Sequence, residues 1–567
     1  MSELKQEYER VMEQLTVKGG MFELTQVEVN GLQYQAYNAA PSSVTELINR
    51  GRDFGDSTFL VYQDERISFA EFFRLVDQVA FCLQQDYGVK PKDRVAIAMR
   101  NYPEWMVFYL AILDIGAVAV PLNSWGQTKE LTYGLEGAQV AMVACDGDRL
   151  ALIEDFVQEH QLPTIVVRSE EQSSYVTPLK DLLVEIPQDA APEYVGIYSD
   201  DPAMIMYTSG TTGLPKGAVV SHRNICNAIL NFECTMTANA MLSSEIIGKA
   251  MAKGYPQAAL LAVPLFHVSG CLSQFIPSLR MGRKLVILHK WNAADALRLI
   301  EQERITSFGG VSNMIQEMLD APEFASTDLD SLFGIGGGGG AQPPHLEELI
   351  QAKMPDALAG TGWGLTESTA TGTSCTGSTY LAHPTSTGLA APIVSLKICD
   401  ARGHEVPQGE TGEVWVYSAT NISGYWNNLD ATQQTFRDGW LRSGDMGYLN
   451  EDGYLFIAGR IKEVVIRGGE NIYPVEVEQC IATMPGVKEV AAVGIPNQDY
   501  GEELVAVVVP HSENSISERQ VQDFVAERLA KFKVPAWVFC QTDPLPRNAT
   551  GKLLKRKLID SIVAEVG

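Results

Sequence analysis

One stretch of the sequence combines glycines, hydroxyl side chains and a lysine in a pattern suited to binding phosphate. It reads YTSGTTGLPKGAVVSH and spans residues 207–222. Glycines free backbone N–H groups to converge on an anion, and hydroxyl groups add further hydrogen-bond donors. The candidate phosphate ligands are Thr208, Ser209, Gly210, Thr211, Thr212, Gly213 and Lys216. A polar surface turn is the alternative, but so long a small-residue run between two apolar stretches is costly in chain entropy unless it binds something.

This stretch differs from the P-loop of kinases and GTPases. That loop has glycine before its lysine and a hydroxyl residue after it, which holds Mg²⁺. Here Pro215 precedes Lys216 and Gly217 follows it. A reaction other than that of the P-loop enzymes is therefore expected.

Four further stretches carry polar or charged residues among glycines and prolines. They are PLFHVSG (264–270), GTGWGLTES (360–368), SGDMGYLNEDGYLFIAGRIKEVVIRGGENIYPVEVE (443–478) and LPRNATGKLLKRKL (545–558). The first places His267 beside Phe266, and the second is expected to form a glycine-rich turn that ends on Thr366 and Glu367. No G-x-S-x-G elbow and no Ser-His-Asp or Cys-His signature occurs, so a protein nucleophile is not expected.

The composition describes a globular protein with more than one domain. The chain has 567 residues, of which 46% are hydrophobic and 20% charged, and this length exceeds a single core. The net charge of -27 argues against non-specific binding to nucleic acid and against adhesion to anionic lipid. A site for ATP must therefore be basic only locally.

No targeting or membrane-spanning segment is expected. The N-terminus is charged, and the apolar run WMVFYLAILDIGAVAVPL contains Asp114, Gly116 and Pro121, which predicts a buried helix running into a strand. The nine cysteines are scattered without a C-x-x-C pair, which is typical of a reducing compartment without disulfides or a structural metal. A cytoplasmic location follows, and homo-oligomerisation stays open.

Alternating strand and helix signals predict an α/β protein. We expect an N-terminal arm over 1–44, a large body of βα-layered sheets over 45–458 that includes a β subdomain from about 385, and a small α+β domain over 459–567. The segment 232–258 interrupts the alternation and is interpreted as an insertion. Capping pairs predict helix starts at Ser68 with Glu71 and at Ser517 with Gln520, and a further helix starts at Pro474.

Together and in this order, the five stretches resemble the motifs of the adenylate-forming superfamily, which comprises acyl-CoA synthetases, adenylation domains and luciferases. The resemblance spans about residues 45–560 and is greatest to fatty-acyl-CoA synthetases. It implies that a carboxylate attacks the α-phosphorus of ATP to give acyl-AMP and pyrophosphate, after which the CoA thiol displaces AMP. Both steps depend on neutralising charge.

The resemblance assigns the nucleotide ligands. Lys216 would pair with the β- and γ-phosphates, and Mg²⁺ would bind Glu367 and Thr211, since Mg²⁺ favours carboxylate and phosphate oxygens. Adenine would stack on an aromatic ring and lie along backbone in a pocket made by Gly340, Ala341, Trp363, Gly364 and Thr366. Many relatives have tyrosine where this chain has Trp363. Asp445 would bind the ribose hydroxyls with help from Arg460.

The resemblance also assigns a mobile catalytic lysine and a hinge. Lys552 would reach from the small domain to the carboxylate and the α-phosphate, and the small domain would rotate about Lys462 between the two half-reactions. Glu463 stands where aspartate is commoner. The predicted pantetheine path is Gly468, Gly469 and Glu470, and the predicted acyl pocket is Phe266, His267, Val311 and Gly338.

These residues predict an ATP- and Mg²⁺-dependent fatty-acid–CoA ligase. Three alternatives stay open: an acyl-AMP ligase that loads a carrier protein, an aryl-acid–CoA ligase or light-producing relative, and a scaffold without turnover. The scaffold predicts loss of a charged site residue, yet all five are present: Lys216, Glu367, Asp445, Arg460 and Lys552.

Overall fold

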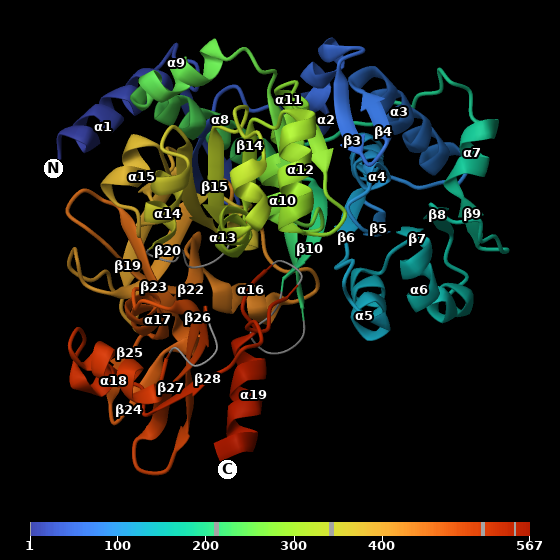
Figure 1. Ribbon diagram of the computed structural model, residues 1–567. Helices are drawn as coiled ribbons and strands as arrows, with labels where there is room; N and C mark the ends of the chain where they lie inside the picture. The colour runs from blue at the N-terminus through green and yellow to red at the C-terminus, as the bar shows by residue number, and fades with distance from the viewer. Residues whose placement is uncertain (1, 209–214, 339–344, 512–515, 549–550, 567) are drawn as a thin grey trace.

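The computed structural model describes residues 2–208, 215–338, 345–511, 516–548 and 551–566 (Figure 1). A large body fills the upper part of the view, and a small C-terminal domain lies beneath it. The predicted α/β architecture, with a large body of sheets and a small α+β domain, is confirmed. Within the described residues, no helix is both long enough and apolar enough to cross a membrane.

Two large sheets form the body. The seven-stranded sheet has the order β11-β10-β6-β5-β7-β8-β9. Its strands are β5 (Arg94–Ala98), β6 (Val118–Pro121), β7 (Met142–Asp146), β8 (Thr164–Val167), β9 (Val176–Pro178), β10 (Pro202–Thr208) and β11 (Lys216–Ser221). All neighbouring pairs are parallel except the β10–β11 hairpin.

The nine-stranded sheet has the order β18-β17-β16-β15-β14-β12-β13-β3-β4. Its strands are β3 (Thr58–Tyr62), β4 (Glu65–Ser68), β12 (Ala258–Leu261), β13 (Lys284–Ile287), β14 (Ser307–Gly310), β15 (Gly334–Gly338), β16 (Leu358–Gly364), β17 (Gly372–Thr376) and β18 (Leu389–Ala390). The central strands are parallel, so their carboxyl ends meet at one edge.

Helices pack on and between these sheets. Those of the body are α2 (Val44–Ile48), α3 (Phe69–Gln85), α4 (Pro103–Asp114), α5 (Thr128–Ala138), α6 (Gly147–Glu159), α7 (Leu179–Glu185), α8 (His222–Leu242), α9 (Ser244–Ala252), α10 (Val268–Gly270), α11 (Ile276–Arg280), α12 (Ala293–Glu303), α13 (Ser312–Asp320), α14 (His345–Lys353), α15 (Ser378–Ala382) and α16 (Leu429–Thr435). The capping box at Ser68 and Glu71 is confirmed at the start of α3. The apolar run is also confirmed as a buried helix, α4, that leads into β6.

Two smaller sheets complete the chain. The β subdomain contains β19 (Val394–Cys399), β20 (Gly412–Ser418), β21 (Phe436–Arg437), β22 (Trp440–Leu449) and β23 (Leu455–Arg460). The C-terminal domain contains β24 (Val465–Arg467), β25 (Glu470–Ile472), α17 (Pro474–Ala482), β26 (Val487–Asn497), β27 (Gly501–Pro510), α18 (Glu518–Ala526), β28 (Trp537–Cys540) and α19 (Lys555–Val566). It has its own buried clusters, and the predicted starts of α17 and α18 are confirmed.

The N-terminal arm packs against the body. It contains α1 (Glu3–Thr16), β1 (Leu24–Val29) and β2 (Leu32–Tyr37). Tyr8 of α1 is buried, and the backbone N–H of Ser2 donates to Asp452 in the β22–β23 turn at 2.8 Å. Tyr34 of β2 stacks on Tyr417 of β20 at a centroid distance of 4.5 Å. The arm therefore joins α8 to the β subdomain.

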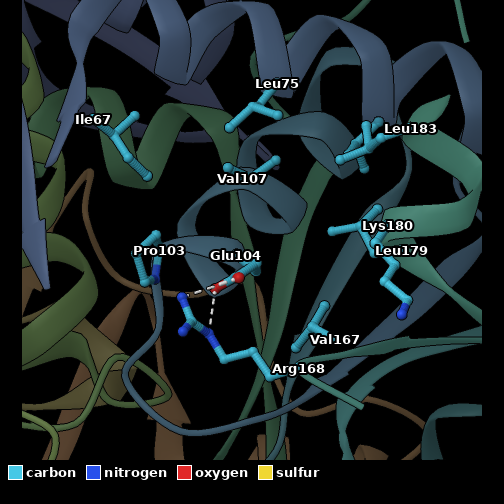
Figure 2. Close-up of a pocket in the computed structure, with 11 residues that line it drawn as sticks. Ile67, Leu75, Pro103, Glu104, Val107, Val167, Arg168, Leu179, Lys180 and Leu183 are labelled. Atoms are coloured by element: carbon cyan, nitrogen blue, oxygen red, sulfur yellow. Dashed lines mark hydrogen bonds and ion pairs between the residues drawn. The ribbon is translucent and has the colours of Figure 1, made fainter. Parts of the chain in front are cut away.

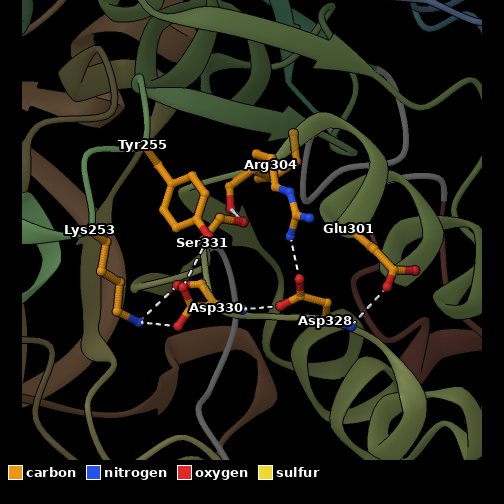
Figure 3. Close-up of polar contacts among 8 residues, drawn as sticks. Lys253, Tyr255, Glu301, Arg304, Asp328, Asp330 and Ser331 are labelled. Carbon is orange, nitrogen blue, oxygen red and sulfur yellow. Dashed lines mark hydrogen bonds and ion pairs between the residues drawn. The ribbon is translucent and has the colours of Figure 1, made fainter.

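The segment 232–258 is helical. Its first part continues α8, where Cys234 and Ala238 are buried beneath α1, and α9 follows. The end of the segment is tied to the loop before β15: Lys253 and Tyr255 both contact Asp330, at 2.8 and 3.0 Å (Figure 3). In the same loop Asp328 pairs with Arg304. These contacts make the segment an integral layer of the body.

The glycine-rich stretch at 360–364 is not the expected turn, because it forms the end of strand β16. Its glycines serve close packing. A Cβ on Gly360 would lie 2.5 Å from Thr376 Oγ1 and 2.9 Å from the Cys375 carbonyl oxygen on β17. The glycine run at 334–338 likewise forms a strand, β15. Gly336 differs, since its Cβ would meet no atom closer than 4.0 Å.

This contrast predicts different costs for alanine at the two positions. Gly360→Ala should lower the free energy of unfolding by about 1–3 kcal/mol, because the new methyl group overpacks the β16–β17 pair. Gly336→Ala should change it by less than about 0.5 kcal/mol, as expected of a substitution that meets no neighbouring atom. Denaturation of both variants beside the parent checks this, and equal losses of stability would contradict it.

Candidate active site

The parallel strands of the large sheet deliver several predicted site residues to one edge. The loop after β12 carries Phe266 and His267, β14 is followed by Val311, β15 ends at Gly338, and β16 leads through Trp363 and Gly364 to Thr366 and Glu367. The predicted residues Ser209, Gly210, Thr211, Thr212, Gly213, Gly340 and Ala341 lie outside the described residues.

A tyrosine links the phosphate-loop lysine to the predicted metal ligand. Tyr425 Oη donates to Glu367 Oε1 at 2.7 Å, and Lys216 Nζ lies 5.1 Å from the Tyr425 ring centroid. Burial and the neighbouring Glu367 carboxylate raise the pKa of Tyr425, so its hydroxyl remains a donor. Lys216 is the first residue of β11, and the Thr208 hydroxyl donates to its carbonyl at 3.4 Å.

Sequence reasoning missed Tyr425. The signal lay in a short Ser-Gly-Tyr-Trp stretch, 423–426, which pairs with β11: Trp426 N–H donates to the Gly217 carbonyl and Val219 N–H to that of Gly424. A Cβ on Gly217 would lie 2.8 Å from Ile205 Cγ2 of β10, so glycine serves the packing of β11 on β10, while Trp426 Cβ would lie 3.5 Å away.

The predicted ribose ligand is held by two side chains. Asp445 Oδ1 accepts from Arg460 Nε at 3.0 Å, and Asp445 Oδ2 accepts from Trp363 Nε1 at 2.9 Å. Asp445 and Arg460 are direct partners in the β22–β23 register. The indole N–H of Trp363 thus orients the Asp445 carboxylate. The predicted stacking of adenine on Trp363 did not suggest this second role. A tyrosine at position 363 would lack the indole N–H.

Lys552 lies close enough to Asp445 and Arg460 for their charges to act on it. Burial, followed by the positive charge of Arg460, lowers the pKa of Lys552 to about 8, against the opposing effects of Asp445 and Glu463. Its backbone N–H donates to Asn548 Oδ1 at 2.8 Å. The preceding Gly551 has φ +78° and packs so close to the body that a Cβ would lie 2.6 Å from Val311 Cγ2. The C-terminal domain therefore delivers Lys552 to the edge of the large sheet.

His267 faces this lysine as a neutral imidazole. Burial and the charge of Lys552 lower the pKa of His267 to about 4. Its Nδ1 lies 2.9 Å from Ser269 Oγ, where the ring closes the short turn before α10. A π-helix, Cys271–Phe275, follows, and its Gln274 amide donates to the Gly309 carbonyl at 3.0 Å.

The strand glycines of this edge lack close neighbours among the described residues. A Cβ on Gly336 or Gly338 would meet no atom closer than 4.0 or 3.7 Å, respectively, and one on Gly309 none closer than 3.5 Å. The predicted acyl-pocket residues Val311 and His267 lie next to these strands. A methyl group at any of the three glycines would therefore make only ordinary van der Waals contacts with the described residues.

The predicted hinge and pantetheine path lie after β23. Lys462 is in the 3₁₀ turn Ile461–Glu463, and burial, then Arg460, lowers its pKa. Gly468 and Gly469, with φ of +60° and +90°, form the two-residue turn between β24 and β25. A two-residue hairpin turn of this kind requires positive φ at both positions, which explains why both residues are glycine. Glu470 is exposed.

A second basic crevice lies at the carboxyl edge of the seven-stranded sheet, where the strand order reverses between β5 and β7. Arg149 is buried and pairs with Asp146 at 2.8 Å, while the Arg100 guanidinium lies 3.1 Å from the Trp125 ring centroid. Arg100 Nη1 is buried with no hydrogen-bond partner. Burial, then the charge of Arg149, lowers the pKa of Arg100. Such switch-point crevices commonly bind ligands, and sequence reasoning missed this one.

The chain matches the AMP-binding enzyme family over residues 48–426 and the AMP-binding enzyme C-terminal domain over 476–552. It therefore belongs to the AMP-binding enzyme family, and the predicted membership of the adenylate-forming superfamily is confirmed. The prediction of an AMP-forming acid–thiol ligase is confirmed at the level of that enzyme class.

Three relatives show the range of this family. The chain is 32% identical over 503 residues to the long-chain-fatty-acid–CoA ligase FadD13 of Mycobacterium tuberculosis, covering 89% of this chain and 94% of that protein. It is 32% identical over 499 residues to the indoleacetate–CoA ligase of Aromatoleum aromaticum, covering 88% and 94%. ATP-bound MatB from Rhodopseudomonas palustris superposes with a TM-score of 0.80 at 29% identity, covering 91% and 98%.

The link from Tyr425 to Glu367 predicts a phenotype for Tyr425→Phe. Without the hydroxyl, the Glu367 carboxylate loses its orienting hydrogen bond, so the KM for Mg²⁺-ATP should rise about tenfold while the fold is kept. Steady-state pyrophosphate release checks this. Tyr448→Phe is the control, because Tyr448 lies in β22 and no hydrogen bond of its hydroxyl is described. Equal KM values for both variants would contradict the role of Tyr425.

The lowered pKa of Lys552 predicts a pH dependence. The ammonium carries its charge below the pKa, so raising the pH through about 8 should reduce kcat/KM for ATP in adenylation. In Lys552→Arg the guanidinium stays charged, so the same limb should be absent from a slower enzyme. A basic limb that persists unchanged in Lys552→Arg would assign it to another group.

Proposed function

We propose that the protein is a fatty-acid–CoA ligase that requires ATP and Mg²⁺. The observation that carries this proposal is the position of Lys552. The C-terminal domain places its ammonium near Asp445, Arg460 and neutral His267, at the carboxyl edge of parallel strands. With Lys462 and Glu463 nearby, three cations and two acids leave a local excess of positive charge in an acidic protein, as the anions of ATP and a carboxylic acid require.

In adenylation, the substrate carboxylate oxygen attacks the α-phosphorus and the bond to the β-phosphate oxygen breaks, so pyrophosphate leaves. Lys552 would bridge the attacking carboxylate and the α-phosphate, since its charge is strongest in the desolvated crevice. Lys216 would pair with the leaving phosphates, and Asp445 with the ribose hydroxyls. Glu367, oriented by Tyr425, fits Mg²⁺, which when bound would neutralise phosphate charge.

In thioesterification, the CoA thiol attacks the acyl carbonyl, AMP leaves, and the thiol proton passes to solvent. Lys552 is not needed for this step, and its site must open. Rotation about Lys462 would replace it with the Gly468–Gly469 turn. The Arg100–Arg149 crevice supports CoA as the acceptor, because its unpartnered guanidinium nitrogen suits a phosphate of the CoA nucleotide.

An aliphatic acid is the proposed substrate class. Its support is the similarity to FadD13, together with Gly336 and Gly338 beside the predicted acyl pocket, since residues without side chains suit a narrow alkyl chain. An aryl acid is the second candidate, favoured by the equal identity to the indoleacetate–CoA ligase. Gln274 adds a polar group beside Gly309, which an aryl substrate with a polar substituent could use.

A substrate panel tests this function. Pyrophosphate release is measured with alkanoates of increasing length and with benzoate- and indoleacetate-type acids, with and without CoA. Continuous turnover that peaks on one alkanoate and requires CoA supports the proposal, whereas a peak on aryl acids replaces the substrate class. Release that stops after one equivalent despite CoA would mean a carrier protein is the acceptor.

The proposed nucleotide site predicts that Arg100→Gln raises the KM for CoA about tenfold, because one charge-assisted hydrogen bond to phosphate is lost. The KM for ATP should stay unchanged. Arg519→Gln is the control, since Arg519 is exposed on α18. The same variant is also measured with dephospho-CoA as substrate. If Arg100→Gln raises the KM for dephospho-CoA less than the KM for CoA, Arg100 binds the 3′-phosphate. If the variant changes neither the KM for CoA nor that for dephospho-CoA, the site is excluded.

A further inference from the structure

A cavity that is partly open to solvent lies between α3, α4 and α7, apart from the residues of the adenylation site. Its volume is about 190 Å³. Apolar side chains from all three helices line it, among them Leu75, Val107 and Leu183 (Figure 2). An apolar cavity of about 150 Å³ suffices to bind benzene, so this one has room for a ring with a small substituent.

One end of the cavity is polar. Glu104, in the first turn of α4, pairs with Arg168 at 3.1 Å, and Figure 2 shows this pair on the cavity wall. Arg168 also binds Glu65 through two hydrogen bonds of 2.7 and 2.8 Å. A single guanidinium therefore serves two carboxylates. Lys180 turns its ammonium away from the pair and contacts Glu170.

These charges select against an ionic ligand. A carboxylate would bring a third negative charge to a guanidinium that already has two partners. A cation would lose its hydration among aliphatic walls next to Arg168. Glu104 can still accept one hydrogen bond, because a carboxylate has more lone pairs than Arg168 uses.

We propose that this cavity is a binding site for a small neutral molecule with an apolar body and a single hydroxyl-type donor, which bonds to Glu104. The site belongs to no part of the adenylation machinery. The turn that carries Glu104 does follow Asn101, whose side chain bonds to Val263 and Leu265 before His267. The ligand would therefore rest against the segment that holds this loop.

Benzyl alcohol is the test probe, with toluene as the analogue that lacks the donor and benzylammonium as the charged analogue. Isothermal titration calorimetry of the full chain should show one site, with benzyl alcohol bound more tightly than toluene and benzylammonium not bound. Leu183→Phe fills the cavity from α7 and should weaken benzyl alcohol at least tenfold. Val184→Phe is the matched control, because Val184 is 86% exposed on the same helix.

A second variant, Val107→Met, fills the cavity from α4, so that the test does not depend on correct folding of Leu183→Phe. The melting temperature of each variant reports whether it is folded. If both filled variants bind benzyl alcohol as the parent does, the probe occupies another site, such as the acyl pocket, and the proposal is wrong. If the parent binds none of the three probes, the cavity is a packing defect and the proposal is equally wrong.

Discussion

The arrangement of this protein depends on one desolvated positive charge. Lys552 is part-buried near Arg460, Asp445 and Glu463, and desolvation followed by the charge of Arg460 lowers its pKa to about 8. An ammonium in such a place costs free energy until an anion arrives. The substrates of adenylation supply anions, so binding energy is gained where negative charge must be neutralised. A neutral His267 opposite the lysine avoids adding a competing cation.

The scaffold serves this charge in two ways. Parallel strands bring Phe266, His267, Val311 and Glu367 to one edge, although they are far apart in the sequence. Glycines then allow close approach where the chain must pack, as at Gly360, whereas a methyl group at Gly336 would meet no atom closer than 4.0 Å. Gly551 belongs to the first kind, because only a residue without a Cβ lets the C-terminal domain rest against Val311.

Much of this was predictable from sequence, for physical reasons. Capping pairs are local, so the starts of α3 and α18 were correct, and the apolar run with Asp114 marked a buried helix. The glycine stretch at 360–364 was mispredicted as a turn, because the need for glycine came from β17, a partner that a single strand does not reveal. Tyr425 and the Arg100–Arg149 crevice were missed because their roles arise only from residues distant in sequence. The position of the C-terminal domain was likewise not predictable, because it depends on the contact between Gly551 and Val311, which are distant in the sequence.

We propose that the docking of Gly551 on Val311 belongs to the adenylating state and must be undone before thioester formation. A Cβ on Gly551 would lie 3.6 Å from that of Val311, which is within the range of a disulfide. The measurement is single-turnover product formation by Val311→Cys/Gly551→Cys, oxidised and then reduced. The oxidised enzyme should release pyrophosphate but form acyl-CoA only after reduction. Acyl-CoA formed equally fast by the oxidised enzyme would contradict it.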